Sequence, residues 1–504
     1  MKTVFSLIAL WTSAAFSEDV SDTLIWRGQN YTFDLNFAAA EQTIDSVITL
    51  FPKHPKGYFF KGSLYFYQMV AGDPKRLSDE AFIAWCEKTV EIAEAYRETA
   101  SDKIESEFYL GLAYGNLGRF HAALGDWIKA FYYGRKTKSL HDDIIHKNKA
   151  YYDAYLSVGL YNYYAATMPK FVEVLANIFG LGGDRDLGLR QLETASAKGT
   201  LARVEAKFLL ANIFMEEGNY DESVVMYRSL RSEFPGNPFL MTQEAMVHYL
   251  ADHFDTAQQL CSSALSKSQS RFPSAEIFAH HFLGRVAKLN RDWDKAIDHF
   301  QRAAKLSASY RMYKSMDGWI AGATYYQLGE TYELAGKRDQ AIKMYESGRD
   351  HAMSGKPTIQ GCKNRLRYAL PEFEIDLTKA RYAVIIGQND QGIQELQPLL
   401  KKAQVSKDYE KFIGQIYFYL GRAEIAQSKW NQGADYFQSA LEAPFGCSDQ
   451  SWVKPHTLYY LAYCHWQNQN KEKSGALLKQ VLQFEDYIDE PRITFLAKAL
   501  QKKI

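Results

Sequence analysis

The fold of this chain is decided by residues 325–348, which read YYQLGETYELAGKRDQAIKMYESG. Their spacing predicts two short helices joined by a tight turn after Gly336. Gly329 in the first helix and Ala341 in the second are small, which lets the two backbones approach closely, and we expect the ring of Tyr345 to fill the space beside them. One such hairpin cannot bury its own apolar face, so it requires neighbours of the same kind.

The same pattern recurs along almost the whole mature chain. We take the small residue of the first helix as the anchor of each copy. Small or bulky apolar residues then recur 12 and 16 positions after the anchor. The anchors that follow this spacing are Gly28, Gly111, Ala211, Gly284 and Gly421, with weaker copies at Ala245, Ala380 and Ala462. In the copy anchored at Gly111, this register assigns Ala123 and Trp127 as the partners in the second helix. Gly28 to Gly62 and Ala211 to Ala245 are each 34 residues apart. The chain therefore resembles a tetratricopeptide-repeat protein, and we predict an all-α, right-handed superhelical solenoid of about ten tetratricopeptide-like helical hairpins.

A second, narrower resemblance lies in the central run 158–196, VGLYNYYAATMPKFVEVLANIFGLGGDRDLGLRQLETAS. This run is similar to the inclusion-body-clearance, tetratricopeptide-repeat-39 family; the matching features are Gly159, Leu160, Asn162, Met168, Pro169, Leu175, Gly180, the stretch 182–185, Gly188, Leu189 and Leu192. The resemblance implies a repeat protein tied to lipid or aggregate handling and without established catalysis. The chain departs from that family at its N-terminus, where residues 1–17 have the pattern of a secretory signal peptide, whereas the family's members are intracellular.

An insertion interrupts the repeat within this run. The register after Gly159 calls for 12 residues before the next anchor, but Gly188 lies 29 residues on. The extra residues predict an inserted helix near 165–182, with an apolar stripe made by Phe171, Val172, Val174, Leu175, Ile178 and Phe179. Two interpretations remain open: the stripe covers neighbouring repeats, or Phe171–Phe179 docks on a partner or makes peripheral contact with a membrane.

The N-terminal residues 1–17, MKTVFSLIALWTSAAFS, have the pattern of a secretory signal peptide. Lys2 precedes a short apolar core, and Ala15 and Ser17 are small residues at the spacing that a signal peptidase accepts. The alternative is a buried first helix. We expect cleavage near Ser17 and export to the periplasm, the cell surface or the medium. The predicted organisation is a signal peptide at 1–17, N-terminal helical repeats with the inserted helix at 18–200, and C-terminal tetratricopeptide repeats at 201–504.

Composition and motifs argue against several classes of function. The chain has 59 basic and 59 acidic residues, so it lacks the basic surplus of a nucleic-acid-binding protein. Its five cysteines are scattered and odd in number, which disfavours a zinc site and a disulfide framework. No nucleotide-binding, metalloprotease or hydrolase motif is present. We therefore predict a protein that is not an enzyme and has no cofactor.

One cluster keeps a catalytic alternative open. His141, Asp142, Asp143 and His146 carry nitrogen and oxygen donors of the kind that zinc or manganese takes. The competing interpretation is a solvated helix end between repeats, and we place no metal there.

The remaining candidate site is a surface. In tetratricopeptide superhelices the first helices line a concave groove, and residues three before, one after and four after each anchor share one helix face. We predict a partner-binding groove that includes Asn212, His281, Arg285, Lys288, Tyr326, Arg381, Phe418, Arg422, Tyr463 and Trp466. Aromatic residues and Arg are enriched in protein-binding surfaces. The predicted function is a non-enzymatic exported scaffold that binds a protein or peptide partner along this groove; the alternatives are a component of a cell-envelope assembly complex and a metal-dependent enzyme.

Overall fold

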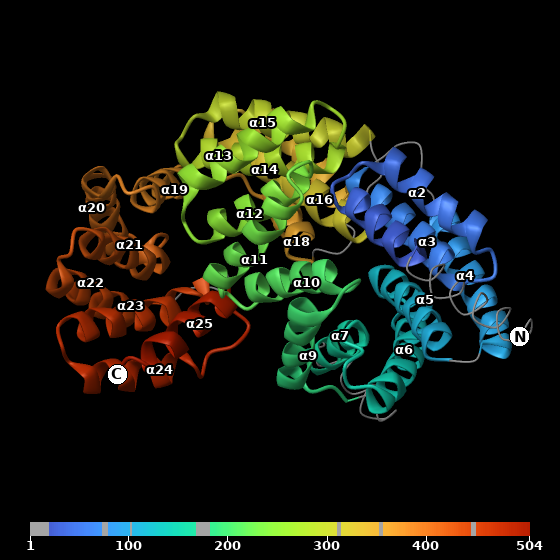
Figure 1. Ribbon diagram of the computed structural model, residues 1–504. Coiled ribbons are helices and arrows are strands. Elements are labelled where there is room, and N and C mark those ends of the chain that lie inside the picture. The colour runs from blue at the N-terminus through green and yellow to red at the C-terminus, as the bar shows by residue number, and fades with distance from the viewer. Residues whose placement is uncertain are drawn as a thin grey trace, which may run out of the picture.

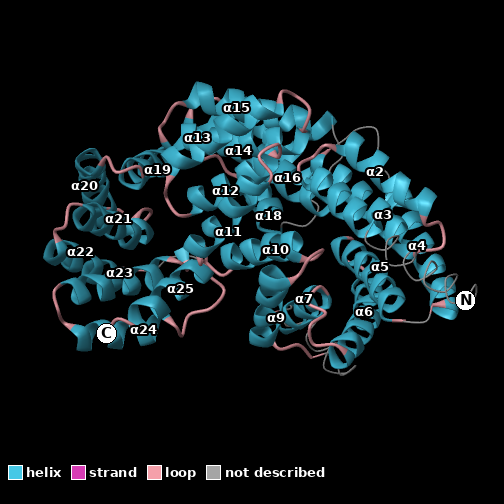
Figure 2. Ribbon diagram, in the orientation of Figure 1, coloured by secondary structure: helices cyan, strands magenta, loops and turns pink. Residues whose placement is uncertain are grey.

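The computed structural model describes residues 20–504 with the exceptions of 73–78, 101–102, 168–181, 310–313, 352–355 and 445–449. The predicted signal peptide and the apolar stripe Phe171–Phe179 lie outside the described residues. Over the residues that are described, the chain consists of helices and loops and contains no strand (Figure 2). The all-α prediction is therefore confirmed.

The helices pair in chain order into antiparallel hairpins. The pairs are residues 20–33 with α2 (Phe37–Leu50), α3 (Pro55–Ala71) with α4 (Asp79–Thr99), α5 (Ile104–Ala123) with α6 (Trp127–Lys147), α7 (Ala154–Ala166) with α9 (Arg185–Lys198), α10 (Arg203–Glu216) with α11 (Tyr220–Glu233), α12 (Pro238–Leu250) with α13 (Phe254–Ser268), α14 (Pro273–Leu289) with α15 (Trp293–Ser309), α16 (Lys314–Leu334) with α17 (Arg338–His351), α19 (Glu372–Ile385) with α20 (Asn389–Val405), α21 (Ile413–Ala426) with α22 (Trp430–Glu442), and α23 (Val453–Gln467) with α24 (Lys471–Val481). Outside this pairing, α18 (Lys356–Arg367) packs on α16 and α17, a short 3₁₀ helix (Glu410–Phe412) precedes α21, and α25 (Glu490–Gln501) packs on α23 and α24.

The hairpins stack so that the first helices form an inner layer. Besides contacting its own second helix, α12 touches α14, α14 touches α16, α19 touches α21, and α21 touches α23. Figure 1 shows α20, α22 and α24 along the outer edge of the C-terminal half, with α21, α23 and α25 inside them. Side chains that leave the inner helices away from their neighbours therefore face the concave side of the solenoid.

In three hairpins a ring of the second helix lies against a glycine of the first. A Cβ placed on Gly329 would lie 2.7 Å from the ring of Tyr345, and Tyr345 is completely buried. The equivalent contact recurs at Gly284 with Phe300 and at Gly421 with Phe437. The predicted close approach and the predicted role of the ring are both confirmed. Because the ring occupies the space where a side chain would start, only glycine allows the two helices this separation.

The predicted register is wrong in the hairpin of α5 and α6. Gly111 packs against the imidazole of His141. Ala123, which the prediction places in the second helix, is the last residue of α5. Trp127 is the first residue of α6 and keeps 37% of its surface exposed. The reason is helix length: these helices have 20 and 21 residues, so Gly111 lies far from the turn and meets a residue equally far along the second helix.

Segments more than 200 residues apart in sequence also touch. Asp34 accepts a hydrogen bond from the backbone N–H of Gly236 at 2.6 Å, and Asn237 donates to the carbonyl of Phe33 at 2.8 Å. At the other end, Arg492 of α25 donates to Asp252 at 2.9 Å. Successive turns of the solenoid are therefore tied to each other by polar contacts, and α10 to α13 lie between the two ends.

Replacing Gly329 by Ala should destabilise the protein by about 1–3 kcal/mol, because the new methyl group would overlap the ring of the buried Tyr345. Chemical denaturation of purified protein measures the change. The matched control is Gly336→Ala. Gly336 follows α16, has a φ of +74° and has no atom near the position of an added Cβ. The loss of stability in this control therefore comes from the backbone conformation and does not depend on Tyr345. A double variant, Gly329→Ala with Tyr345→Leu, should recover part of the lost stability. If Gly329→Ala unfolds at the wild-type denaturant concentration, the ring contact does not hold the hairpin together.

Candidate functional site

Three arginines on inner helices form the most distinctive feature of the concave side, and we call them the arginine row: Arg285, Arg381 and Arg422. Arg285 of α14 lies over the ring of Tyr249 of α12, with its guanidinium carbon 4.2 Å from the ring centroid. The other two repeat this arrangement on neighbouring hairpins, Arg381 over Tyr419 at 5.3 Å and Arg422 over Tyr460 at 4.6 Å. Each cation–π contact fixes a guanidinium between two adjacent first helices.

The arginines of the row form no ion pair within the described residues, although Glu330 attracts the charge of Arg381 and Asp489 attracts that of Arg422. Within the described residues none of the three arginines has a carboxylate oxygen within 4.0 Å, and all three side chains are half-buried. The Nε of Arg381 is buried and has no hydrogen-bond acceptor. A guanidinium stays protonated at any physiological pH, so this part of the concave side presents fixed positive charge.

Lys288, the nearby cation on α14, differs because its charge is neutralised inside the protein. Its ammonium pairs with Glu330 of α16 and donates to Gln327 Oε1 at 2.6 Å, and only 5% of the residue is exposed. Burial by itself lowers the pKa of Lys288, but the attraction of Glu330 outweighs it, so the pKa is raised. Burial likewise tends to raise the pKa of Glu330, and Lys288 lowers it overall. This pair joins two inner helices and is not available to a partner.

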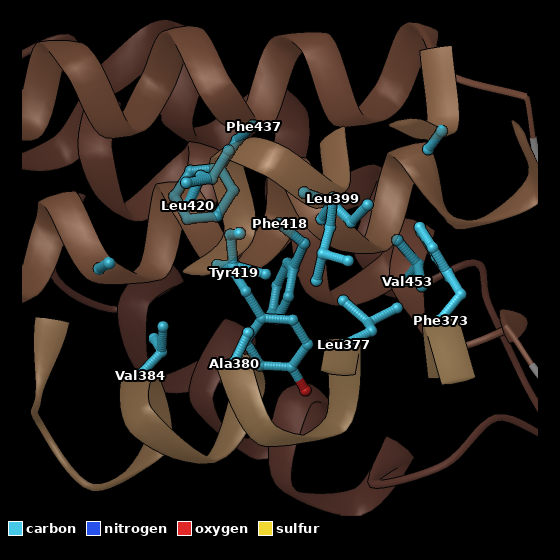
Figure 3. Packing of buried hydrophobic residues seen from close by; sticks show 14 of the residues in the cluster. Phe373, Leu377, Ala380, Val384, Leu399, Phe418, Tyr419, Leu420, Phe437 and Val453 are labelled. Carbon is cyan, nitrogen blue, oxygen red and sulfur yellow. The ribbon is translucent and has the colours of Figure 1, made fainter. Parts of the chain in front are cut away.

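The structure separates the ten predicted groove residues into buried and half-buried ones. His281 is 1% exposed and bonds Thr324 Oγ1 at 2.9 Å, and Phe418 is 1% exposed inside the cluster shown in Figure 3. These two side chains, like Lys288, are part of the packing between helices and cannot contact a partner in this structure. The other seven are half-buried: Asn212, Arg285, Tyr326, Arg381, Arg422, Tyr463 and Trp466. That they bind a partner stays a prediction.

Two of the three buried residues share a position that the sequence assigned to the groove. His281 and Phe418 lie three residues before their anchors, whereas Arg285 and Arg422 lie one residue after the same anchors. His281 and Phe418 therefore lie in the contact between successive first helices. Tyr326, three residues before Gly329, is half-buried, so the position alone does not decide burial. Sequence reasoning missed the rings of Tyr249, Tyr419 and Tyr460, which lie under the arginines; the signal available was a Tyr on the first helix of the neighbouring repeat.

The histidine and aspartate cluster on α6 does not form a metal site. His141 is completely buried, stacks on Phe108 and lies 3.0 Å from its carbonyl oxygen, and burial lowers its pKa to about 4. Asp142 pairs instead with Lys138. Among the residues that the structure describes, no group of three or more His, Cys, Asp or Glu side chains could hold a metal ion.

The four described cysteines, Cys86, Cys261, Cys362 and Cys464, are buried and unbridged. Burial raises the pKa of the Cys261 thiol to about 12. In the described part of the chain, no helix combines the length and the apolar character needed to cross a membrane.

These features define the class of the protein as a tetratricopeptide-type helical-repeat scaffold, of the kind that typically mediates protein–protein interaction. Residues 324–354, which include the hairpin quoted at the start, match the family model of the tetratricopeptide repeat. Residues 154–337 match that of Iml2/Tetratricopeptide repeat protein 39, so both resemblances stated from the sequence are confirmed. No catalytic family matches the chain, and no curated protein matches it.

Several solved helical-repeat structures resemble the chain at low identity. The Cut9–Hcn1 hetero-tetramer of the APC/C gives 12% identity over 96% of each chain with a TM-score of 0.29. The C-terminal part of a repeat protein from Cytophaga hutchinsonii gives 17% identity over 56% of this chain and 97% of that chain, with a TM-score of 0.23. NprR in complex with its cognate peptide NprX gives 12% identity over 60% and 84%, with a TM-score of 0.26. At such scores the similarity carries no conclusion about function.

Replacing Glu330 by Ala should cost about 3–5 kcal/mol of unfolding free energy, because it leaves the buried ammonium of Lys288 without its counter-charge. Replacing both residues by Met removes the two charges together and should be much less harmful. Urea denaturation of the two variants and of wild type makes the comparison. A double variant as unstable as Glu330→Ala would show that the loss comes from packing and not from an unpaired charge.

Proposed function

We propose that this protein is an exported, non-enzymatic scaffold whose concave side binds a protein or peptide segment that presents carboxylates to the arginine row. The observation that carries this proposal is the repeated arrangement of Arg285, Arg381 and Arg422. Each guanidinium is half-buried, rests on a tyrosine ring and has no ion pair within the described residues.

Fixed guanidinium groups suit the recognition of carboxylates. A guanidinium has five N–H donors in a rigid fork, and a carboxylate can accept two of them at once. Because the tyrosine rings already hold the arginines in place, a partner pays less side-chain entropy to order them. Arginine is also among the residues that dominate binding energy when they lie in a partly desolvated surface.

The tetratricopeptide-type class supports the non-catalytic part of the proposal. Export rests on residues 1–17, and a location in the periplasm or at the cell surface follows from it. Membership in a cell-envelope assembly is the narrower alternative, and a stable stoichiometric complex recovered from cells would favour it.

The binding test compares two triple variants that remove equal charge. Arg285→Ala, Arg381→Ala and Arg422→Ala together should abolish capture of the partner in a crosslinking pull-down from intact cells. The matched control removes Lys295, Arg302 and Arg349, which are exposed on the outer helices α15 and α17. The control should capture the full set of partners, and its melting temperature and that of the test variant should both stay near wild type. If the test variant retains the full set, the arginine row is not the binding surface.

Export makes a separate prediction. N-terminal sequencing of protein recovered from the exported fraction should begin at Glu18 or within a residue or two, because cleavage follows the small residues Ala15 and Ser17. A Ser17→Arg variant, with a bulky charge at the cleavage position, should accumulate in the uncleaved form. An exported protein that still begins at Met1 would contradict the proposal of a cleaved signal.

A further inference from the structure

A large apolar cavity lies between α5, α6, α7 and α10, apart from the arginine row. Its volume is about 490 Å³, within the range of small-molecule sites in proteins. The four helices lie together in the N-terminal half of the solenoid (Figure 1). The packing contacts within the hairpins do not account for this open space.

Small residues create the cavity. Gly115, Gly118 and Ala122 of α5 and Ala130 and Gly134 of α6 line it, and none of these residues contributes a bulky side chain. The nearest atoms to a Cβ on Gly115 belong to Thr137 at 3.5 Å, whereas in the regular hairpins a ring presses against the glycine. In this hairpin a ring packs against Gly111 but none packs against Gly115.

The walls and the mouth of the cavity are apolar or aromatic. Leu156 and Leu160 of α7 and Leu209 of α10 form part of the wall. Trp127 and Tyr164 line it as well and keep 37% and 39% of their surfaces exposed. Water gains few hydrogen bonds against such walls, so transfer of an apolar group into the cavity is favourable.

Polar groups that line the cavity already satisfy each other. Arg119 pairs with Glu205 and donates to Asn116 Oδ1 at 2.7 Å. Its guanidinium also lies 5.3 Å from the ring centroid of Phe66. Because this pair is neutral overall, it gives a ligand no charge to recognise, and the end of a ligand that enters the cavity should be apolar.

The edge of the cavity along α6 carries four cationic side chains, of which Lys129 pairs with Asp126 and Lys138 pairs with Asp142. Residues 127–138, WIKAFYYGRKTK, contain Lys129, Arg135, Lys136 and Lys138 and no acidic residue. Arg135 directly follows the lining residue Gly134, is exposed and forms no ion pair within the described residues. Its charge acts on Tyr161, which lines the cavity: burial raises the pKa of that phenol and Arg135 opposes the rise. An unpaired cation thus stands beside the mouth.

We propose that this cavity binds the hydrocarbon chain of a single-chain anionic amphiphile, of the class of long-chain fatty acids, with its carboxylate beside Arg135. The apolar walls accept the chain, the neutral Arg119–Glu205 pair excludes a second charged end, and the basic edge of α6 fixes the orientation. The site is independent of the arginine row, so either proposal can fail without the other.

The test uses the purified mature chain and the fluorescent fatty acid cis-parinaric acid, below its critical micelle concentration. Fluorescence should rise with saturable one-to-one binding, and oleate should displace the probe. Ala130→Phe, which places a ring in the cavity, should weaken binding by about tenfold or more. Ile128→Phe is the control on the same helix, since Ile128 is 82% exposed and does not line the cavity. Thermal melting checks that both variants fold.

A second variant tests the charged edge. Arg135→Glu should weaken displacement by oleate about tenfold and leave displacement by the uncharged methyl oleate unchanged. Arg302→Glu, on the outer helix α15, is the control. Absence of saturable binding, or equal binding by wild type and Ala130→Phe, would overturn the site, and equal weakening of both displacers would overturn the role of Arg135.

A third variant distinguishes an external ligand from the chain's own apolar stripe. Thr167, which lines the cavity, directly precedes residues 168–181. Replacing 168–181 with a Gly/Ser linker of equal length should leave probe binding at the wild-type affinity. Binding that occurs only in the linker variant would show that the stripe occupies the cavity, and it would overturn the proposal.

Discussion

The structure depends on the close approach of two helices at a glycine that faces an aromatic ring. Where Gly284, Gly329 and Gly421 meet Phe300, Tyr345 and Phe437, the ring takes the space that a side chain on the glycine would need. This contact sets the separation of the two helices in a hairpin, and the hairpin then offers an apolar face that only another hairpin can cover. The long solenoid follows from the repetition of one local constraint.

The same constraint decides which residues of an inner helix are available to a partner. Because successive first helices pack against each other, His281 and Phe418, three residues before their glycines, lie between these helices. The position one after the glycine emerges on the concave side, and there Arg285 and Arg422 rest on tyrosines of the adjacent repeats. The same position after Gly329 is Glu330, which pairs with Lys288, so the packing of the first helices places charged side chains at this position but not only arginines.

The hairpin of α5 and α6 differs from the regular hairpins, because a cavity lies beside its two helices. Gly111 packs against the buried imidazole of His141, and Gly115, Gly118 and Gly134 line the cavity between these helices and α7 and α10. The cavity is stable because the neighbouring helices are held by other contacts, including the Arg119–Glu205 pair that joins α5 to α10. Contacts such as Arg492 with Asp252 tie the turns of the solenoid together in the same way, far from any repeat signal.

The sequence by itself determined the helical-repeat fold, the partner of the glycine in regular hairpins and the family resemblance of the central run, because these depend on the spacing of residues within about one repeat. It could not determine the register of α5 and α6, since helix length and not a fixed offset decides which residues meet across a long hairpin. It also could not distinguish Arg285 from His281, because both lie on one helix face and only the neighbouring first helix decides which is covered. The cavity and the contacts between solenoid turns were decided by tertiary structure alone, because they join residues from separate repeats. The spacing of residues along the chain does not indicate which of these repeats contact each other.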